Sequence, residues 1–163
     1  GAVAVVALDD QGRVALIRQY RVPVGAFLWE VPAGLLDGGP EETLVGAAKR
    51  ELAEETDLQA SHWDVLVDFG TSPGATDEVL GIFLARGISA AASSDFVREG
   101  EEAEIQLDWV DLTEAADAVL AGRVHSPSAV MGILAAERAA RDGFTALRGV
   151  DAPFILRPWL LPA

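Results

Sequence analysis

The stretch AAKRELAEETDL, residues 47–58, contains the side chains with the clearest chemical potential in this sequence. Glu51, Glu54 and Glu55 place three carboxylates within five residues, directly after Arg50. Like charges at helical spacing repel one another by roughly a few tenths of a kcal/mol per exposed pair. The crowding therefore raises the question of whether a cation binds here.

On a helix, these carboxylates occupy neighbouring positions. Glu51 and Glu55 are four residues apart and lie on one face, and Glu54 flanks that face. Arg50 lies four residues before Glu54 and eight after Glu42, so it can pair with either carboxylate. Mg²⁺ binds oxygen ligands and usually takes one or two carboxylates together with waters and substrate phosphates. The spacing alone leaves two interpretations open: a divalent-cation site, or a solvated surface helix with salt bridges.

The composition restricts the classes of protein to which the chain can belong. Its 163 residues suffice for one domain with a buried core. Twelve Lys and Arg against 26 Asp and Glu give a net charge of −14, which argues against nucleic-acid binding. The sequence has no cysteine and no apolar run long enough to span a bilayer. We therefore expect a cytoplasmic protein without nucleic-acid or membrane partners.

The remaining sequence predicts the elements that must position these side chains. Two β-branched runs around a turn at 9–12 predict a hairpin. A helix is predicted from Pro40 to Thr56, because proline suits the first helical position and apolar residues then recur at i, i+3, i+4 and i+8. Further strands are expected at 28–31, 62–70, 78–87 and 105–112, helices at 113–122 and 126–143, and a loop at 89–104. This order predicts an α+β fold with a mixed β-sheet and flanking helices.

The order of these charges resembles the core of the Nudix hydrolase signature, written G-x5-E-x7-R-E-U-x-E-E-x-G-U with U an aliphatic residue. Glu42 is followed by seven residues, then by RELAEE at 50–55, and Leu58 matches the last aliphatic position. This is a specific pattern of fixed charges at fixed offsets. It favours the divalent-cation site over the solvated helix.

Two positions depart from the signature. Asp57 stands where the late glycine is expected, and we expect it to end the helix in a left-handed conformation at a cost of roughly 1 kcal/mol. Gly34 best matches the first glycine, with seven rather than five residues before Glu42. The additional residues fall in a loop, where insertion costs little. Neither departure removes a carboxylate.

Motifs outside this segment resemble the ADP-ribose pyrophosphatase group of the family, particularly its actinobacterial-looking members. They are RQYR at 18–21, LWEVPAGLLD at 28–37, TSPGATDE at 71–78 and EEAEIQLDWV at 101–110. The resemblance covers about residues 2–140 and implies a Nudix-type α/β/α sandwich. It also implies Mg²⁺-dependent hydrolysis of ADP-ribose, or a related nucleoside diphosphate sugar, to AMP and ribose 5-phosphate, with Mn²⁺ able to substitute. Another NDP-sugar, a dinucleotide or a nucleoside triphosphate is the alternative substrate.

The same resemblance assigns roles to the charged residues. The metal ligands that it implies are the carboxylates of Glu51 and Glu55, the carboxylate of Glu54 for a further ion or for orienting its neighbours, and the carbonyl of Ala33. Arg50 is expected to support catalysis by pairing with Glu42 and holding the loop and the helix together.

A loop glutamate is commonly the base that positions the attacking water in such enzymes. The matching region is residues 99–105, where we expect Glu102 to be the base, then Glu101, with Glu104 as the third choice. The other interpretation of this loop is an acidic tip without a catalytic role.

Substrate contacts are expected from the strand motifs. Arg18 and Arg21 are cations in an acidic chain and can bind phosphate, or each is simply a strand-end arginine exposed to water. Glu30 follows Trp29 at the position where related enzymes contact the adenine or the ribose. Trp29 can equally be a core aromatic residue.

A second substrate-side segment is expected where the strand at 62–70 connects to the strand at 78–87. Ser72, Gly74 and Glu78 align with a loop of the family that faces the substrate. Gly74 either lets the backbone approach a ribose or simply makes a turn.

We expect a catalytic domain at residues 1–145 and a Pro-rich tail at 146–163, packed on the domain or at a dimer interface. The resembled group usually carries an N-terminal β-rich segment that forms a domain-swapped dimer. That segment is not present in this chain, which starts at its first expected strand. A homodimer that binds a small nucleotide sugar is still expected, since active sites in this group borrow residues across the interface.

Overall fold

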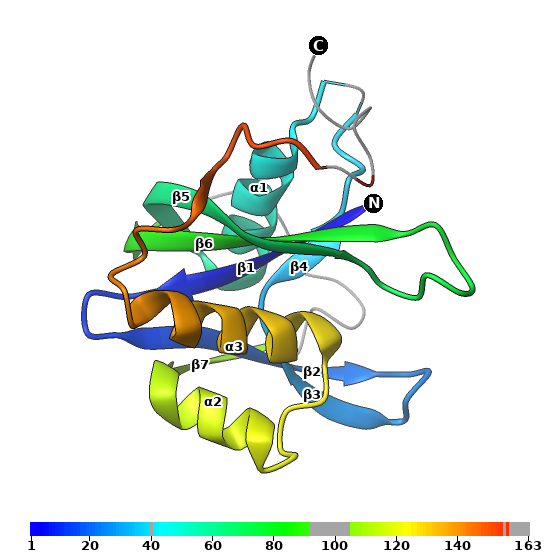
Figure 1. Cartoon of the computed structure of the whole chain (residues 1–163). Helices are drawn as coiled ribbons and strands as arrows, with labels where there is room; N and C mark the ends of the chain where they lie inside the picture. Colours follow the sequence, from blue (N-terminus) through cyan, green and yellow to red (C-terminus); the bar gives the residue numbers. More distant parts are fainter. Residues whose placement is uncertain (40, 92–104, 155, 157–163) are drawn as a thin grey trace.

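The computed structural model describes residues 1–39, 41–91, 105–154 and 156, which form a mixed β-sheet with helices on both faces (Figure 1). The elements are β1 (Ala2–Leu8), β2 (Arg13–Arg21), β3 (Ala26–Glu30), β4 (Ala33–Leu35), α1 (Leu44–Thr56), β5 (Leu58–Gly70), β6 (Val79–Ala90), β7 (Gln106–Asp111), α2 (Leu112–Leu120), α3 (Pro127–Ala140) and β8 (Arg148–Gly149). The expected α+β fold, an α/β/α sandwich with a mixed sheet, is confirmed. Within these ranges, none of the helices combines the length and the apolar character needed to cross a membrane.

Strand β1 lies at the centre of the sheet and determines where the other strands run. The strand order is β3-β2-β1-β6-β5-β8, and β4 and β7 pair additionally with β1 and β2. β1 is parallel to β6, and the other pairs are antiparallel. Ala4 pairs with Ala33 and Ala2 with Leu35, so the start of β1 positions β4.

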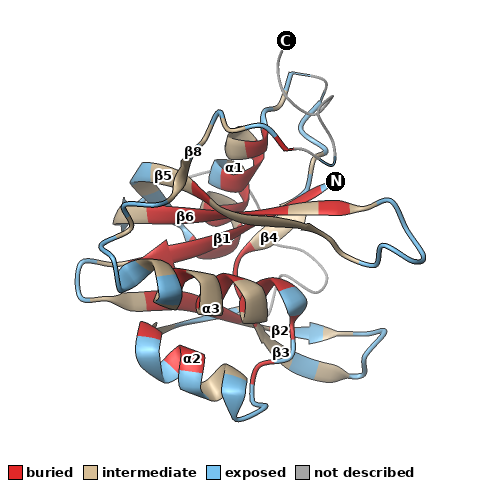
Figure 2. Ribbon diagram, in the orientation of Figure 1, coloured by how far each residue is buried: buried red, intermediate tan, exposed pale blue. Residues whose placement is uncertain are grey.

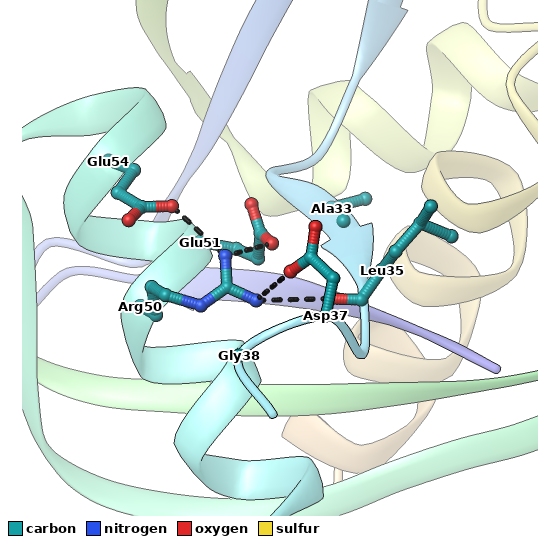
Figure 3. A pocket seen from close by; sticks show the side chains of 8 residues that line it. Ala33, Leu35, Asp37, Gly38, Arg50, Glu51 and Glu54 are labelled. Carbon is teal, nitrogen blue, oxygen red and sulfur yellow. Dashed lines mark hydrogen bonds and ion pairs between the residues drawn. The ribbon is translucent and has the colours of Figure 1, made fainter. Parts of the chain in front are cut away.

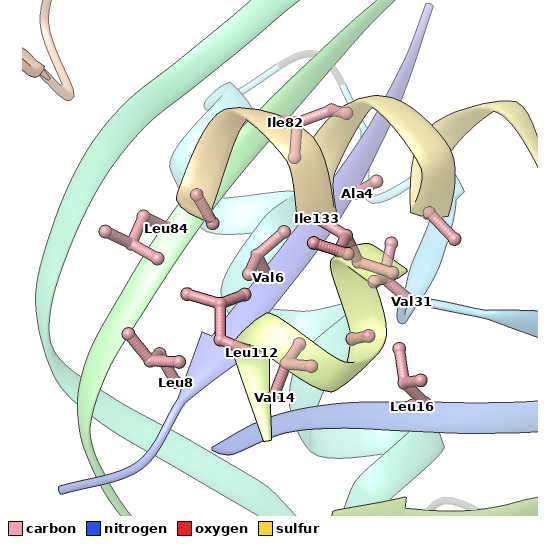
Figure 4. Packing of buried hydrophobic residues seen from close by; sticks show 14 of the residues in the cluster. Ala4, Val6, Leu8, Val14, Leu16, Val31, Ile82, Leu84, Leu112 and Ile133 are labelled. Atoms are coloured by element: carbon pink, nitrogen blue, oxygen red, sulfur yellow. The ribbon is translucent and has the colours of Figure 1, made fainter. Parts of the chain in front are cut away.

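The side chains of β1 alternate between two apolar cores, one on each face of the sheet. All of β1 is buried (Figure 2). Val3 and Val5 pack toward α1, whereas Val6 packs toward α2 and α3 (Figure 4). Burial of each of these side chains contributes roughly 1.5–3 kcal/mol. Gly132 lets α3 approach the sheet closely, because a Cβ atom there would lie 2.7 Å from Val6 Cγ2.

Helix α1 begins at Leu44, so the prediction that it begins at Pro40 was wrong. Thr43 caps the helix, because its side chain accepts a hydrogen bond of 3.0 Å from the Gly46 N–H. Glu42 lies before this cap and instead accepts a hydrogen bond from the Gly38 N–H. The C-terminus agrees with the prediction: Asp57 is left-handed, with φ 57° and ψ 29°.

Other boundaries differ from the predicted ones for local reasons. β5 and β6 are longer than predicted, since they pair with each other over almost their whole length. Helix α2 begins at Leu112, one residue before the predicted start at Thr113. Asp111 caps it, because its carboxylate accepts hydrogen bonds from the backbone N–H groups of Thr113 and Glu114. The short β8 was not predicted at all. Most of the predicted loop at 89–104 lies outside the described residues.

The described part of the tail contacts the core on the α1 side. Phe154 is buried and stacks on Phe83, with 6.5 Å between the ring centroids. Gly81 makes room for it, since a Cβ at that position would overlap the Phe154 ring. The division of the chain at residue 145 stays a prediction.

Candidate active site

A pocket of about 480 Å³ lies between β4, the loop that follows it and helix α1 (Figure 3). Its wall consists of Ala33, Gly34, Leu35, Asp37, Gly38, Arg50, Glu51 and Glu54. Strand β4 contributes backbone groups to this wall, and helix α1 contributes charged side chains. The pocket therefore brings together the expected backbone ligand and two of the expected carboxylate ligands.

Arg50 lies in the middle of this pocket and contacts four carboxylates. Its Nε donates to Glu42 at 2.9 Å, and its Nη1 donates to Glu51 at 2.6 Å and to Glu54 at 3.0 Å. Its Nη2 donates to Asp37 at 2.9 Å. The predicted pair of Arg50 and Glu42 is present, and these contacts raise the pKa of the guanidinium and keep it charged.

The carboxyl group of Glu51 is buried against the backbone of β4. A Cβ at position 34 would overlap the Glu51 carboxyl group, so a larger residue than Gly34 would displace that carboxyl group from its present position. Burial raises the pKa of Glu51, while the neighbouring Arg50 acts in the opposite direction. Glu42 shows the reverse balance: the hydrogen bond from Arg50 outweighs burial and lowers its pKa.

Glu55 links the helix to the strand directly. Its Oε2 accepts a hydrogen bond of 2.9 Å from the Ala33 N–H, and its side chain is buried. Ala33 and Glu55 are therefore neighbours, as two ligands of one ion must be. This carboxylate contacts the N–H of Ala33, whereas the predicted metal ligand is the carbonyl of Ala33.

The residues of the pocket fit a hard divalent cation in their chemistry. Four carboxylates face one guanidinium, which leaves a surplus of three negative charges when all are ionised. Oxygen donors and surplus negative charge are what Mg²⁺ requires. Among the described residues, no three acidic or histidine side chains form a ready-made cation site, since Arg50 stands between the carboxylates.

Two of the expected substrate residues bind each other. Arg21 donates from Nε to Glu30 Oε1 at 2.9 Å and from Nη2 to Glu30 Oε2 at 2.6 Å. Arg18 lies three residues before Arg21, so their side chains leave opposite faces of β2. The Arg18 guanidinium lies 4.5 Å above the Phe27 ring. A contact of Arg18 with substrate stays a prediction.

The loop between β5 and β6 holds the other expected substrate residues. Ser72 accepts backbone hydrogen bonds from Ala75 and Thr76 through its carbonyl, and Glu78 accepts from the Thr71 hydroxyl at 2.7 Å. A Cβ at Gly74 would meet no atom within 4 Å, so close packing does not require glycine there. Glu78 lines a second pocket of about 350 Å³, which shares no wall residue with the Arg50 pocket.

The predicted bases Glu102, Glu101 and Glu104 lie outside the described residues, so their assignment stays a prediction. Sequence reasoning missed two side chains that the structure places near the expected site residues. Asp37 contacts Arg50, and its signal was an acidic residue in the glycine-containing loop before α1. Gln19 is buried two residues before Arg21, and its Oε1 accepts no hydrogen bond from the described part of the chain.

Comparisons with known proteins identify the family of this chain. The model of the NUDIX domain family matches residues 1–129. The chain therefore belongs to the Nudix family, and it is a Nudix hydrolase.

Its relatives include the ADP-ribose pyrophosphatase of Mycobacterium tuberculosis, which is 44% identical over 97% of this chain and 74% of the relative. The ADP-ribose pyrophosphatase of Bacillus subtilis is 38% identical over 64% of this chain and 56% of the relative. The methanol dehydrogenase activator of Bacillus methanolicus is 32% identical over 82% of this chain and 70% of the relative. The predicted resemblance to the ADP-ribose pyrophosphatase group is confirmed.

A solved structure, described as an ADP compounds hydrolase, has the same fold. It superposes with a TM-score of 0.68 at 21% identity, covering 87% of this chain and 74% of that structure. At this identity the likeness confirms the arrangement of sheet and helices alone.

Proposed function

We propose that the protein hydrolyses the pyrophosphate bond of ADP-ribose, or of a related nucleoside diphosphate sugar, with Mg²⁺ as its cofactor. The observation that carries the proposal is the pocket in which carboxylates of α1 meet the backbone of β4 with surplus negative charge. Its support in sequence is the 44% identity to an ADP-ribose pyrophosphatase over almost the whole chain. Mn²⁺ is expected to substitute for Mg²⁺.

Each residue of the pocket has a specific role in this proposal. Glu51 and Glu55 hold the cation, Glu54 holds a further ion or orients its neighbours, and the Ala33 carbonyl completes the protein ligands. When bound, a divalent cation in such a site offsets the charge of a pyrophosphate and makes water more acidic. Because hard cations prefer oxygen ligands, the carboxylates need no thiolate or imidazole partner.

The reaction adds one water across the pyrophosphate and yields AMP and ribose 5-phosphate. A glutamate of the loop, Glu102 first and Glu101 or Glu104 otherwise, takes the proton of the attacking water. Arg18 and Arg21 are proposed to contact phosphate and Glu30 the adenine or the ribose. Ser72, Gly74 and Glu78 are proposed to face the substrate from the loop between β5 and β6. A homodimer, which the resemblance implies, and a cytoplasmic location, which the composition predicts, also stay predictions.

A substrate panel tests this function most broadly. ADP-ribose, other sugar nucleotides, dinucleotides and nucleoside triphosphates are offered at equal concentration with Mg²⁺, and product release is followed with and without a chelator. We expect ADP-ribose to give the highest kcat/KM, AMP as product and no turnover with the chelator. A higher kcat/KM for a triphosphate or a dinucleotide would favour the alternative substrate class.

A further inference from the structure

Arg50 has two groups of partners, and they come from different parts of the chain (Figure 3). On the helix side, Nη1 donates to Glu51 at 2.6 Å and to Glu54 at 3.0 Å. On the loop side, Nη2 donates to the Leu35 carbonyl at 3.0 Å and to Asp37 at 2.9 Å, and Nε donates to Glu42 at 2.9 Å. One guanidinium therefore bridges the helix and the loop that follows β4.

The helix-side partners are Glu51, which is proposed to hold the cation, and Glu54, which is proposed to hold a further ion or to orient its neighbours. A cation bound to either carboxylate lies close to Nη1, and the two positive groups repel each other. Binding of the ion therefore weakens the hold of Nη1 on these carboxylates. The loop-side bonds of Arg50 then carry more of the work of holding the guanidinium and neutralising its charge.

Asp37 is suited to that task by its position. Its side chain is 70% exposed, so its carboxylate can follow a small movement of the guanidinium. Asp37 lies just before Gly38 and Gly39. Gly39 has a φ of 102°, which residues other than glycine rarely adopt. Asp37 also lies outside the carboxylates of the family signature, and sequence reasoning gave it no role.

We propose that Asp37 is a positioning residue for cation binding: it holds Arg50 on the loop side and so frees Glu51 and Glu54 for a divalent ion. The inference rests on the proposed function, because it assumes that divalent ions bind at Glu51 and beside Glu54. It adds that the affinity for the ion depends on where Arg50 is held. Asp37 acts through Arg50 and does not itself touch the ion.

Calorimetric titration with Mn²⁺ tests the proposal on the full chain. We expect Asp37→Asn to raise the Mn²⁺ dissociation constant by roughly two- to fivefold, the range of one exposed ion pair. Asp37→Glu keeps the charge and should restore the wild-type value. Asp10→Asn is the matched control. Asp10 is exposed in the turn after β1, whereas β4 pairs with the start of β1. This variant should bind Mn²⁺ with the wild-type dissociation constant.

A double-mutant cycle separates action through Arg50 from direct attraction of the ion. If Asp37 acts through Arg50, Asp37→Asn should have no further effect on Mn²⁺ affinity in an Arg50→Gln background, in which the positive charge is absent. An equal loss in both backgrounds would mean that Asp37 attracts the ion directly, and the proposal would be wrong. An unchanged affinity of Asp37→Asn in a wild-type background would overturn it as well.

A measurement on the wild type keeps the proposal testable if Arg50→Gln does not fold. In arginine side-chain NMR, addition of Mg²⁺ should shift the Arg50 Nη signals and the Asp37 carboxyl signal together. Arg50 signals that do not respond to Mg²⁺ would contradict the proposal. If the wild type binds neither Mn²⁺ nor Mg²⁺, the proposed function fails together with this inference, whereas binding that Asp37→Asn leaves unchanged refutes the inference alone.

Discussion

Glu51 and Glu30 are both buried glutamates that contact an arginine, and the contacts described for these two arginines differ in their balance of charge. Arg21 binds Glu30 through two parallel hydrogen bonds, so that pair is electrically neutral. Arg50 is shared among four carboxylates, so its surroundings keep an excess of negative charge. The comparison predicts that the ratio of charges, more than burial, separates a cation site from a neutral ion pair.

The largest expected effect is on catalysis at the cluster with surplus charge. Glu51→Gln or Glu55→Gln should lower kcat by at least about a hundredfold, because the cation supplies several kcal/mol to the transition state. The fold should persist, since glutamine has the same shape as glutamate. Rates of AMP release and circular dichroism measure the two effects. Glu41→Gln is a matched control in the exposed loop before the helix, and near-wild-type rates for Glu51→Gln would refute the ligand assignment.

The next effect concerns the proposed general base. Among Glu102→Gln, Glu101→Gln and Glu104→Gln, one variant should lose about a hundredfold in kcat, as removal of a general base does. We expect that variant to be Glu102→Gln. Single-turnover kinetics with saturating Mg²⁺ distinguish the three. Mild losses in all three would place the base elsewhere.

Removal of Arg21 should break the neutral pair of Arg21 and Glu30 and lower the free energy of unfolding. Arg21→Ala leaves Glu30 buried without its guanidinium, which should cost about 2–3 kcal/mol; this lies below the usual range because the Arg21 side chain is 34% exposed. Arg138→Ala is the matched control, since its side chain is 70% exposed and lies 3.6 Å from Asp142. The free energy of unfolding of Arg138→Ala should be lower than that of the wild type by at most about 0.5 kcal/mol. Equal midpoints of urea unfolding for the two variants would show that burial of Glu30 carries no such cost.

The smallest expected effect is at the end of the helix that carries the carboxylates. Asp57→Gly should raise the free energy of unfolding by up to about 1 kcal/mol, because glycine adopts a φ of 57° without strain. Mg²⁺ dependence of the rate should not change. Thermal unfolding measures the gain, and a loss of Mg²⁺ dependence would mean that Asp57 has a role at the cation site.

The part of the site that lies within one helix could be predicted from the sequence. The offsets among Arg50, Glu51, Glu54 and Glu55 fix their common face, because helical geometry depends only on spacing. The helix start was less predictable. Proline at position 40 is a strong local signal, but Glu42 binds Gly38 and Arg50, and Thr43 caps the helix instead.

Contacts between elements could not be predicted in the same way. The pairing of Arg21 with Glu30 depends on the register of β2 and β3, which neither residue specifies. The contact of Asp37 with Arg50 depends on how the loop after β4 folds back over the helix. The hydrogen bond from Ala33 to Glu55 joins residues 22 positions apart, and it needs β4 to pair with β1.

Calorimetric titration with Mg²⁺ of the wild type, Glu51→Gln and Glu30→Gln tests the central claim most directly. Substituting a glutamate in the cluster with surplus negative charge should abolish or strongly weaken binding. Substituting the glutamate of the neutral pair should leave the Mg²⁺ dissociation constant within about twofold of wild type, a difference of less than about 0.5 kcal/mol. Equal Mg²⁺ affinity of the wild type and Glu51→Gln would contradict the account.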